Sequence, residues 1–144
     1  MKLSTKCRYG LRAVLEIARK YDKTPAKRKD IANKEGISPS YLENILLVLR
    51  NHKLVETTRG VNGGYVLSKP PSEISAYEIV SALEGPLSLV DCVDEPQGCE
   101  KSGRCVTRTV WCEAAKAVHE VLKKVSLQEL LDREKKTGSL DYSI

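Results

Sequence analysis

The chain has 144 residues, of which 41% are hydrophobic and 30% are charged, and its formal net charge is +5. This length and composition indicate a single soluble domain with a modest core, and no apolar run reaches the roughly 18 residues that a membrane helix needs. Charged residues interrupt the N-terminal segment, which therefore lacks the apolar centre of a signal peptide, and we expect a cytoplasmic protein.

The first predicted element is a helix within residues 2–21. Its apolar residues are Leu11, Val14, Leu15 and Ala18, and this spacing predicts a helix with one buried face.

Two short helices are predicted next, joined by a tight turn. The first covers residues 27–35 and ends at Gly36, a residue suited to a helix C-terminus. The second begins with Ser38 as N-cap and Pro39 at the first helical position. The residues expected to be buried on this second helix are Leu42, Ile45, Leu46 and Leu49.

Strand-forming residues then replace the helical spacing. Residues 55–58 and 65–66 flank the turn sequence GVNGG, which predicts a β-hairpin. Ser75 and Glu78 form a capping-box pattern that begins another helix, which extends to about Glu84.

A loop follows, and then two more helices. A long helix is predicted over residues 106–125, and a last helix begins at a capping pattern near Ser126 and ends near Lys136. The apolar stripe of the long helix is spaced by threes and fours: Val110, Ala114, Ala117, Val121 and Val125.

The order helix, short helix, turn, second helix and hairpin is that of a winged helix-turn-helix. Ala32 is the small residue at the helix crossing, and Gly36 lies in the turn. Residues 1–60 contain 14 Lys or Arg and 6 Asp or Glu, a balance of +8, whereas residues 61–144 contain 10 and 13, a balance of −3. We therefore expect the first part to bind DNA, although a solvated basic surface would show the same balance.

In this motif, residues at the start of the second helix reach base edges in the major groove. Those residues are Ser38, Ser40, Tyr41 and Glu43. A carboxylate such as that of Glu43 repels phosphate but can accept from a cytosine amino group; a solvated helix charge is the alternative. Arg59 at the hairpin tip is placed to enter a narrow minor groove. The cations expected to contact phosphates are Lys27, Arg28, Lys29, Arg50 and Lys53.

Five stretches of the chain together resemble the BadM-like family of small winged-helix regulators, typified by the iron–sulfur regulator IscR and the nitric-oxide sensor NsrR. They are MKLSTKCRYGLRA, DIANKEGISPSYLENIL, LVETTRGVNGGYVL, EIVSALEGP and CVTRTVW, and the resemblance covers residues 1 to about 131. It implies a mainly helical fold with a small β-hairpin wing, and a homodimeric transcription factor that binds a double-stranded DNA operator. It also implies an Fe–S cluster, either 2Fe–2S or 4Fe–4S, with Fe–S assembly proteins as further partners.

Four parts of the chain are expected on this basis. They are a winged helix-turn-helix domain over 1–84, a cysteine-rich cluster-binding loop over 85–105, a dimerisation helix and C-terminal helix over 106–136, and a flexible tail over 137–144.

Four of the five cysteines lie within residues 92–112. In a reducing compartment such clusters more often bind metal or undergo redox chemistry than form structural disulfides. The spacing C-x6-C-x5-C lets a flexible loop wrap thiolates around one inorganic core. A zinc site more often has paired C-x2–4-C spacings, and metal-free thiols are a further alternative. The resemblance assigns the cluster to Cys92, Cys99 and Cys105.

The fourth ligand departs from the family pattern. IscR-type members have a histidine three residues after the third cysteine, where this chain has Arg108, which cannot ligate. In NsrR-like members a residue near the start of the first helix reaches the partner's cluster, and Cys7 is one position from it. Cys112, about 10 Å from Cys105 along a helix axis, is the weaker candidate. Either thiol is otherwise a small buried hydrophobe. The remaining candidates are Asp91, Glu95 or a small molecule.

Two functions therefore remain open. The first is a dimeric regulator whose DNA binding is tuned by an Fe–S cluster. The second is a cluster-free regulator controlled by thiol redox chemistry or by a partner protein. An enzyme is not expected, since the sequence shows no nucleophile–base–orienter set, no nucleotide loop and only the dispersed His52 and His119.

Overall fold

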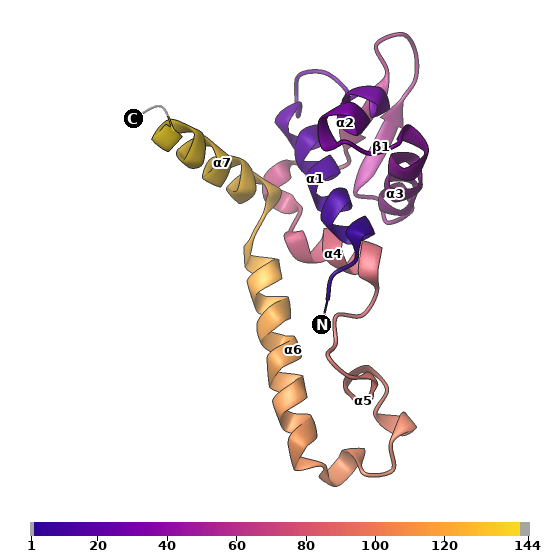
Figure 1. Cartoon of the computed structure of the whole chain (residues 1–144), viewed down its shortest axis with the longest axis vertical. Helices are drawn as coiled ribbons and strands as arrows, with labels where there is room; N and C mark the ends of the chain where they lie inside the picture. Colours follow the sequence, from indigo (N-terminus) through magenta and orange to yellow (C-terminus); the bar gives the residue numbers. More distant parts are fainter. Residues whose placement is uncertain (1, 142–144) are drawn as a thin grey trace.

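The computed structural model describes residues 2–141 (Figure 1). Its N-terminal part contains α1 (Thr5–Arg19), α2 (Arg28–Glu35), α3 (Pro39–Asn51), β1 (Val55–Thr58), β2 (Gly64–Leu67), the 3-10 turn η1 (Pro71–Glu73) and α4 (Ala76–Glu84). Its C-terminal part contains α5 (Asp91–Asp94), the 3-10 turns η2 (Pro96–Gly98) and η3 (Ser102–Arg104), α6 (Val106–Lys124) and α7 (Leu127–Asp141). This mainly helical chain with its two-stranded antiparallel hairpin confirms the predicted fold class.

The helices α2 and α3 form the predicted helix-turn-helix. Helix α2 ends at Gly36, whose φ of 66° is a left-handed conformation that glycine adopts at little cost. Helix α3 begins with Pro39, and the Oγ of Ser38 accepts a hydrogen bond from the N–H of Tyr41 at 3.2 Å. The face of α3 that the sequence predicted to be buried is fully buried: Leu42, Ile45, Leu46 and Leu49. Anchoring this face leaves the opposite side of α3 in solvent.

The wing is a two-stranded hairpin whose second strand also pairs with one residue of the segment before α2. The strands β1 and β2 pair in antiparallel register from Val55 opposite Leu67 to Thr58 opposite Gly64. Ala26 and Tyr65 exchange two backbone hydrogen bonds of 2.8 Å, so β2 is also held to the segment that enters α2. A Cβ at position 64 would lie 2.5 Å from the carbonyl oxygen of Ala26, which explains the glycine at that position.

Helix α1 buries a wider face than the predicted one. Leu11 and Leu15, which the spacing placed in the core, are only partly buried at its edge, whereas Cys7 and Gly10 are buried. The reason is that α1 contacts α2, α3, α4 and α7, so several of its sides are covered. A Cβ at Gly10 would lie 2.3 Å from Cδ1 of Leu83, which shows that the missing side chain lets α4 approach α1 closely.

The junction between the two last helices lies against the N-terminal part. The predicted capping box begins α4. The N–H of Ala76 donates to the carbonyl oxygen of Val125 at 2.8 Å, and the N–H of Leu127 donates to that of Ile74 at 2.9 Å. These bonds fix the junction of α6 and α7 beside the start of α4. From this junction α6 projects away from the N-terminal part, and α7 lies against α1 (Figure 1).

The end of the chain differs from the prediction. Helix α7 continues to Asp141, beyond the predicted end near Lys136, and an ion pair between Arg19 and Glu134 ties it to α1. Residues 142–144 of the predicted tail lie outside the described residues. Within residues 2–141, no helix combines the length and the apolar character needed to cross a membrane.

Candidate nucleic-acid interface and cysteine loop

The exposed side of α3 forms a candidate recognition face, which we define as Ser40, Glu43, Asn44 and Leu47. All four side chains are exposed, while the opposite side of the helix is buried in the core. Sequence reasoning missed Asn44, although its position four residues after Ser40 and next to Glu43 places it on the same face. An asparagine amide can bind adenine through two hydrogen bonds, so this face carries side chains suited to reading base edges.

Two of the predicted DNA-reading residues have structural partners. The hydroxyl of Ser38 caps α3 by accepting from the N–H of Tyr41, and it lies 3.3 Å from the hydroxyl of Ser40. The ring of Tyr41 is partly buried and packs edge-on against Tyr9 of α1, with 6.3 Å between ring centroids. The guanidinium of Arg12 lies 5.7 Å from the centroid of the Tyr9 ring. Ser38 and Tyr41 therefore also hold the start of α3 in place.

Glu43 and Arg28 form an ion pair across the helix-turn-helix, joining α3 to the start of α2. Both side chains are about half-exposed, so the solvent screens the pair and its contribution to stability is small. The pair holds the Glu43 carboxylate between the two helices. Arg28, which the sequence assigned to phosphate contacts, is thus engaged with the carboxylate expected to read a base.

The remaining predicted cations are exposed, and none of their side chains makes an ion pair within the described part of the chain. They are Lys27 at the N-cap of α2, Lys29 in the first turn of α2, Arg50 in the last turn of α3, Lys53 just after α3, and Arg59 in the wing. The tip of the wing also exposes 92% of Val61. Uncommitted cations around an exposed recognition helix and wing form the electrostatic footprint of a DNA-binding surface.

The segment from α5 to the start of α6, which carries the three cysteines assigned to a cluster, lies at the end of α6 remote from the DNA-binding part (Figure 1). Cys92 lies in α5, Cys99 follows η2, and Cys105 is the residue before α6. Their thiols suit an Fe–S cluster in kind, since such clusters bind cysteine thiolates. However, no three His, Cys, Asp or Glu side chains among the described residues form a group that could hold a metal ion. The loop therefore supplies the donors without holding them together in the conformation described.

Arg108 connects two parts of this loop. Its Nε–H donates to the carbonyl oxygen of Cys92 at 2.8 Å, joining α6 to α5. The Sγ of Cys105 lies 3.2 Å from the hydroxyl of Thr107. Hydrogen bonds from Thr107 and from the backbone N–H of Arg108 lower the pKa of the Cys105 thiol. The start of α6 thus favours the thiolate form, which is the form that binds iron.

The candidate fourth ligands occupy very different surroundings. Cys7 is only 1% exposed in the core, where burial and the neighbouring Glu84 carboxylate raise the pKa of its thiol to about 11. Its thiol would have to leave the core to reach a partner subunit. Cys112 is partly buried on α6, and Asp91 and Glu95 are exposed in the loop. The structure brings none of these groups into a ligand set with the three loop cysteines, and the fourth ligand stays a prediction.

Helix α6 exposes an apolar surface, which we call the arm face. It comprises Val106, Val110, Trp111 and Val121, which are 79%, 54%, 40% and 63% exposed. On the other side, Ala115 is the buried residue that this helix contributes among those described, and α6 packs there against α4. An exposed apolar surface of this kind indicates an interaction site.

The comparisons with known proteins agree with this geometry. The sequence profile of the Rrf2 family, described as an iron-dependent transcriptional regulator, matches residues 3–133. The chain belongs to the Rrf2 family. It is therefore a winged-helix, DNA-binding transcriptional regulator, which confirms the resemblance found in the sequence.

Three relatives of the chain illustrate the range of the Rrf2 family. Protein rrf2 of Nitratidesulfovibrio vulgaris is 40% identical over 131 residues, which cover 91% of this chain and 87% of that protein. The structure of CymR, the global cysteine regulator of B. subtilis, has a TM-score of 0.78 at 38% identity and covers 92% of this chain and 98% of its own. The structure of T. potens IscR has the same TM-score at 33% identity, with coverages of 95% and 90%. The chain is thus similar to Protein rrf2, to CymR and to IscR at identities of 40%, 38% and 33%.

Proposed function

We propose that this Rrf2-family regulator is a homodimer that recognises a specific operator and whose DNA binding is tuned by an Fe–S cluster held by Cys92, Cys99 and Cys105. The observation that carries the DNA-binding part is the recognition face of α3, which is exposed while its opposite face is fully buried. The exposed cations of α2, α3 and the wing add affinity for phosphates. DNA as the partner supports a cytoplasmic location.

The arm face supports the homodimer. Its four apolar side chains gain most by meeting an identical face, because a two-fold symmetric pair buries both copies at once. Two recognition helices related by the same two-fold axis would then read two half-sites of one operator. The helix α6 joins this interface directly to the cysteine loop, since Cys105 is the residue before its first turn.

The cysteine loop supports the cluster through its donors. When bound, an Fe–S cluster would supply iron–thiolate bonds whose presence depends on iron, sulfide and redox state. Cys105 already has a lowered thiol pKa, and Arg108 holds the backbone of Cys92. The loop and the first turn of α6 would therefore be more ordered when the cluster is bound than when it is absent. Because α6 also carries the arm face, this change would alter the placement of the two recognition helices, as a ligand-controlled switch requires.

A cluster-free regulator is the second candidate. It is favoured by the absence, within residues 2–141, of a preformed group of three metal-binding side chains. In that case the accessible thiols of the loop would respond to oxidants, and α6 would transmit the change through the same dimer interface. Anaerobic purification separates the two candidates, since only the first requires iron and sulfide.

DNA binding is tested by selecting an operator from random DNA and measuring affinities at several salt concentrations. Arg59→Ala should weaken binding to the operator more than binding to random DNA. Lys27→Ala should weaken binding to both DNAs about equally. It should also reduce the slope of the logarithm of the binding constant against the logarithm of the salt concentration by about one unit per lost phosphate contact. If Arg59→Ala lowers both affinities to the same extent, Arg59 is a phosphate contact and the assignment to the minor groove is wrong.

A further inference from the structure

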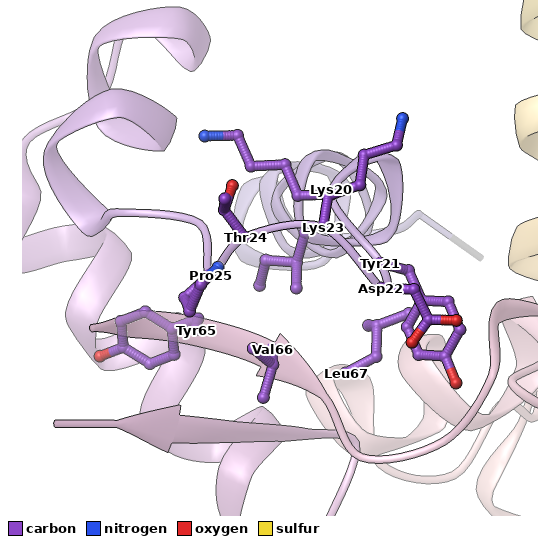
Figure 2. A pocket seen from close by; sticks show the side chains of 10 residues that line it. Lys20, Tyr21, Asp22, Lys23, Thr24, Pro25, Tyr65, Val66 and Leu67 are labelled. Atoms are coloured by element: carbon purple, nitrogen blue, oxygen red, sulfur yellow. The ribbon is translucent and has the colours of Figure 1, made fainter. Parts of the chain in front are cut away.

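A pocket of about 270 Å³ lies between the end of α1, the turn after it and strand β2 (Figure 2). Its apolar walls are aliphatic: Ile17, Pro25, Val66 and Leu67. Lys20, Tyr21, Asp22, Lys23, Thr24 and Tyr65 complete the lining. The volume lies just below the range of about 300–1,000 Å³ that is typical of ligand sites, so only a small ligand would fit. No part of the DNA-binding or cluster chemistry described above uses this pocket.

The polar groups of this pocket are uncommitted. Within the described residues, the side chains of Lys20, Lys23 and Thr24 make no ion pair or hydrogen bond, and neither do the hydroxyls of Tyr21 and Tyr65. The adjoining hollow between α1 and α7 is different. There Arg19 is paired with Glu134, and Lys135 with Asp132. Tyr21 and Lys23 line both hollows, whereas the uncommitted Lys20, Thr24 and Tyr65 line the pocket beside β2 and not the adjoining one.

The charges of the pocket favour an anion. The charged groups of the lining are Lys20, Lys23 and one carboxylate, that of Asp22, which leaves one positive charge in excess. Figure 2 shows both lysine side chains extending from the turn away from β2, with Asp22 beside Tyr21. Neither ammonium group is held by a partner, and long side chains at the surface change rotamer freely. Either lysine can therefore swing over the mouth of the pocket.

We propose that this pocket binds a small monocarboxylate with a short aliphatic tail. The tail would contact Ile17, Val66 and Leu67, and the carboxylate would pair with Lys20 or Lys23. One wall of the pocket is the wing strand β2, and another is Pro25. The residue after Pro25 is Ala26, which exchanges two backbone hydrogen bonds with Tyr65 of β2. An occupant would therefore touch both the wing and the segment that enters the helix-turn-helix. By thermodynamic linkage, the factor by which the bound carboxylate changes the affinity for DNA equals the factor by which bound DNA changes the affinity for the carboxylate.

The test uses 4-methylpentanoate as probe and 4-methylpentanamide as its uncharged isostere. Both are titrated into the ¹⁵N-labelled full-length protein without DNA, and amide chemical shifts are recorded. The acid should shift amides of residues 20–24 and 65–67 with saturation and a dissociation constant on the order of millimolar, because a probe this small makes few contacts. Because either lysine can form the ion pair, Lys20→Ala and Lys23→Ala should each raise that constant about twofold, and the double variant should raise it up to about fivefold, the upper range for one exposed ion pair.

Lys124→Ala is the matched control, because Lys124 is an exposed lysine at the end of α6, outside the pocket. It should leave the dissociation constant unchanged, and the amide isostere should bind more weakly than the acid. The proposal is overturned if the pocket amides do not shift, if acid and amide bind equally, or if Lys124→Ala weakens binding as much as the pocket variants do. None of these results depends on DNA or on a cluster, so they are separate from the tests of the proposed function.

Discussion

The Nε–H of Arg108 donates a hydrogen bond to the carbonyl oxygen of Cys92 at 2.8 Å. This bond joins α6 to α5, and so connects two of the segments that carry the loop cysteines. The IscR-type sequences that the chain resembles have a histidine at the position of Arg108, where the resemblance implies a ligand. In this chain the side chain at that position holds the backbone of a cysteine instead of binding iron itself.

Arg108→His should therefore add a nitrogen ligand within reach of the loop. If a cluster is bound, the visible spectrum of the anaerobically purified variant should differ from that of the wild type, because nitrogen replaces another ligand. Arg108→Ala is the control, since it removes the hydrogen bond to Cys92 without adding a ligand. Identical spectra for the histidine variant and the wild type would show that position 108 does not face the cluster.

The ion pair between Glu43 and Arg28 predicts separable effects on DNA binding. Glu43→Ala should lower the preference for the operator over random DNA by about 1–3 kcal/mol, the range for one base contact. Arg28→Ala should weaken binding to both DNAs, because it removes a cation near phosphates. A double-mutant cycle, in which the affinities of both DNAs are measured for each single variant and for the double variant, gives the coupling energy between Glu43 and Arg28. An unchanged operator preference in Glu43→Ala would make this carboxylate a solvated charge.

The arm face predicts that dimerisation depends on Val121, which is 63% exposed in the single chain. Val121→Glu should weaken the dimer and the operator affinity together, because a carboxylate would be buried against an apolar partner surface. Val121→Leu keeps the surface apolar and should leave both unchanged. Analytical ultracentrifugation at micromolar concentration gives the oligomeric state. A wild-type protein that sediments as a monomer under these conditions would contradict the proposed homodimer.

The burial of Cys7 predicts a loss of stability at alkaline pH. The pKa of its thiol is raised from 9.0 to about 11, so the unfolded chain releases this proton at lower pH than the folded one. The free energy of unfolding should therefore be unaffected by Cys7 below pH 9 and decrease by roughly 2–3 kcal/mol as the pH rises from 9 to 11. Urea unfolding of wild type and Cys7→Ala under reducing conditions isolates this effect. The decrease should be smaller by that amount in the variant, and equal decreases would contradict the assignment.

The sequence predicted well the parts of the fold that are determined locally. The buried face of α3, its Ser38 cap, the capping box of α4 and the hairpin all depend on residues close to one another in the chain. The predicted face of α1 was incomplete, because the close approach of α4 at Gly10 depends on tertiary packing. Sequence spacing also did not distinguish the part of α6 that packs on α4 from the part that stays exposed.

The candidate site was predicted in its residue types more than in its contacts. The spacing of Ser40, Glu43 and Arg59 placed them at an exposed helix start and wing, where the structure has them. The pairing of Glu43 with Arg28 required the crossing of two helices and was not visible in the sequence. The short helices α5, η2 and η3 were also missed, because segments this brief have little intrinsic stability and depend on contacts such as that of Arg108.

The proposed cysteine-loop cluster is tested most directly by the iron and acid-labile sulfide content of the anaerobically purified protein, measured together with its visible absorption. The wild type should be coloured and contain iron and sulfide in equal amounts. Cys99→Ala should be colourless yet folded, because Cys99 is exposed, and Cys112→Ala should keep the colour. A wild-type protein without iron and sulfide, or a cluster that is lost in Cys112→Ala and kept in Cys99→Ala, would contradict the proposed cysteine-loop cluster.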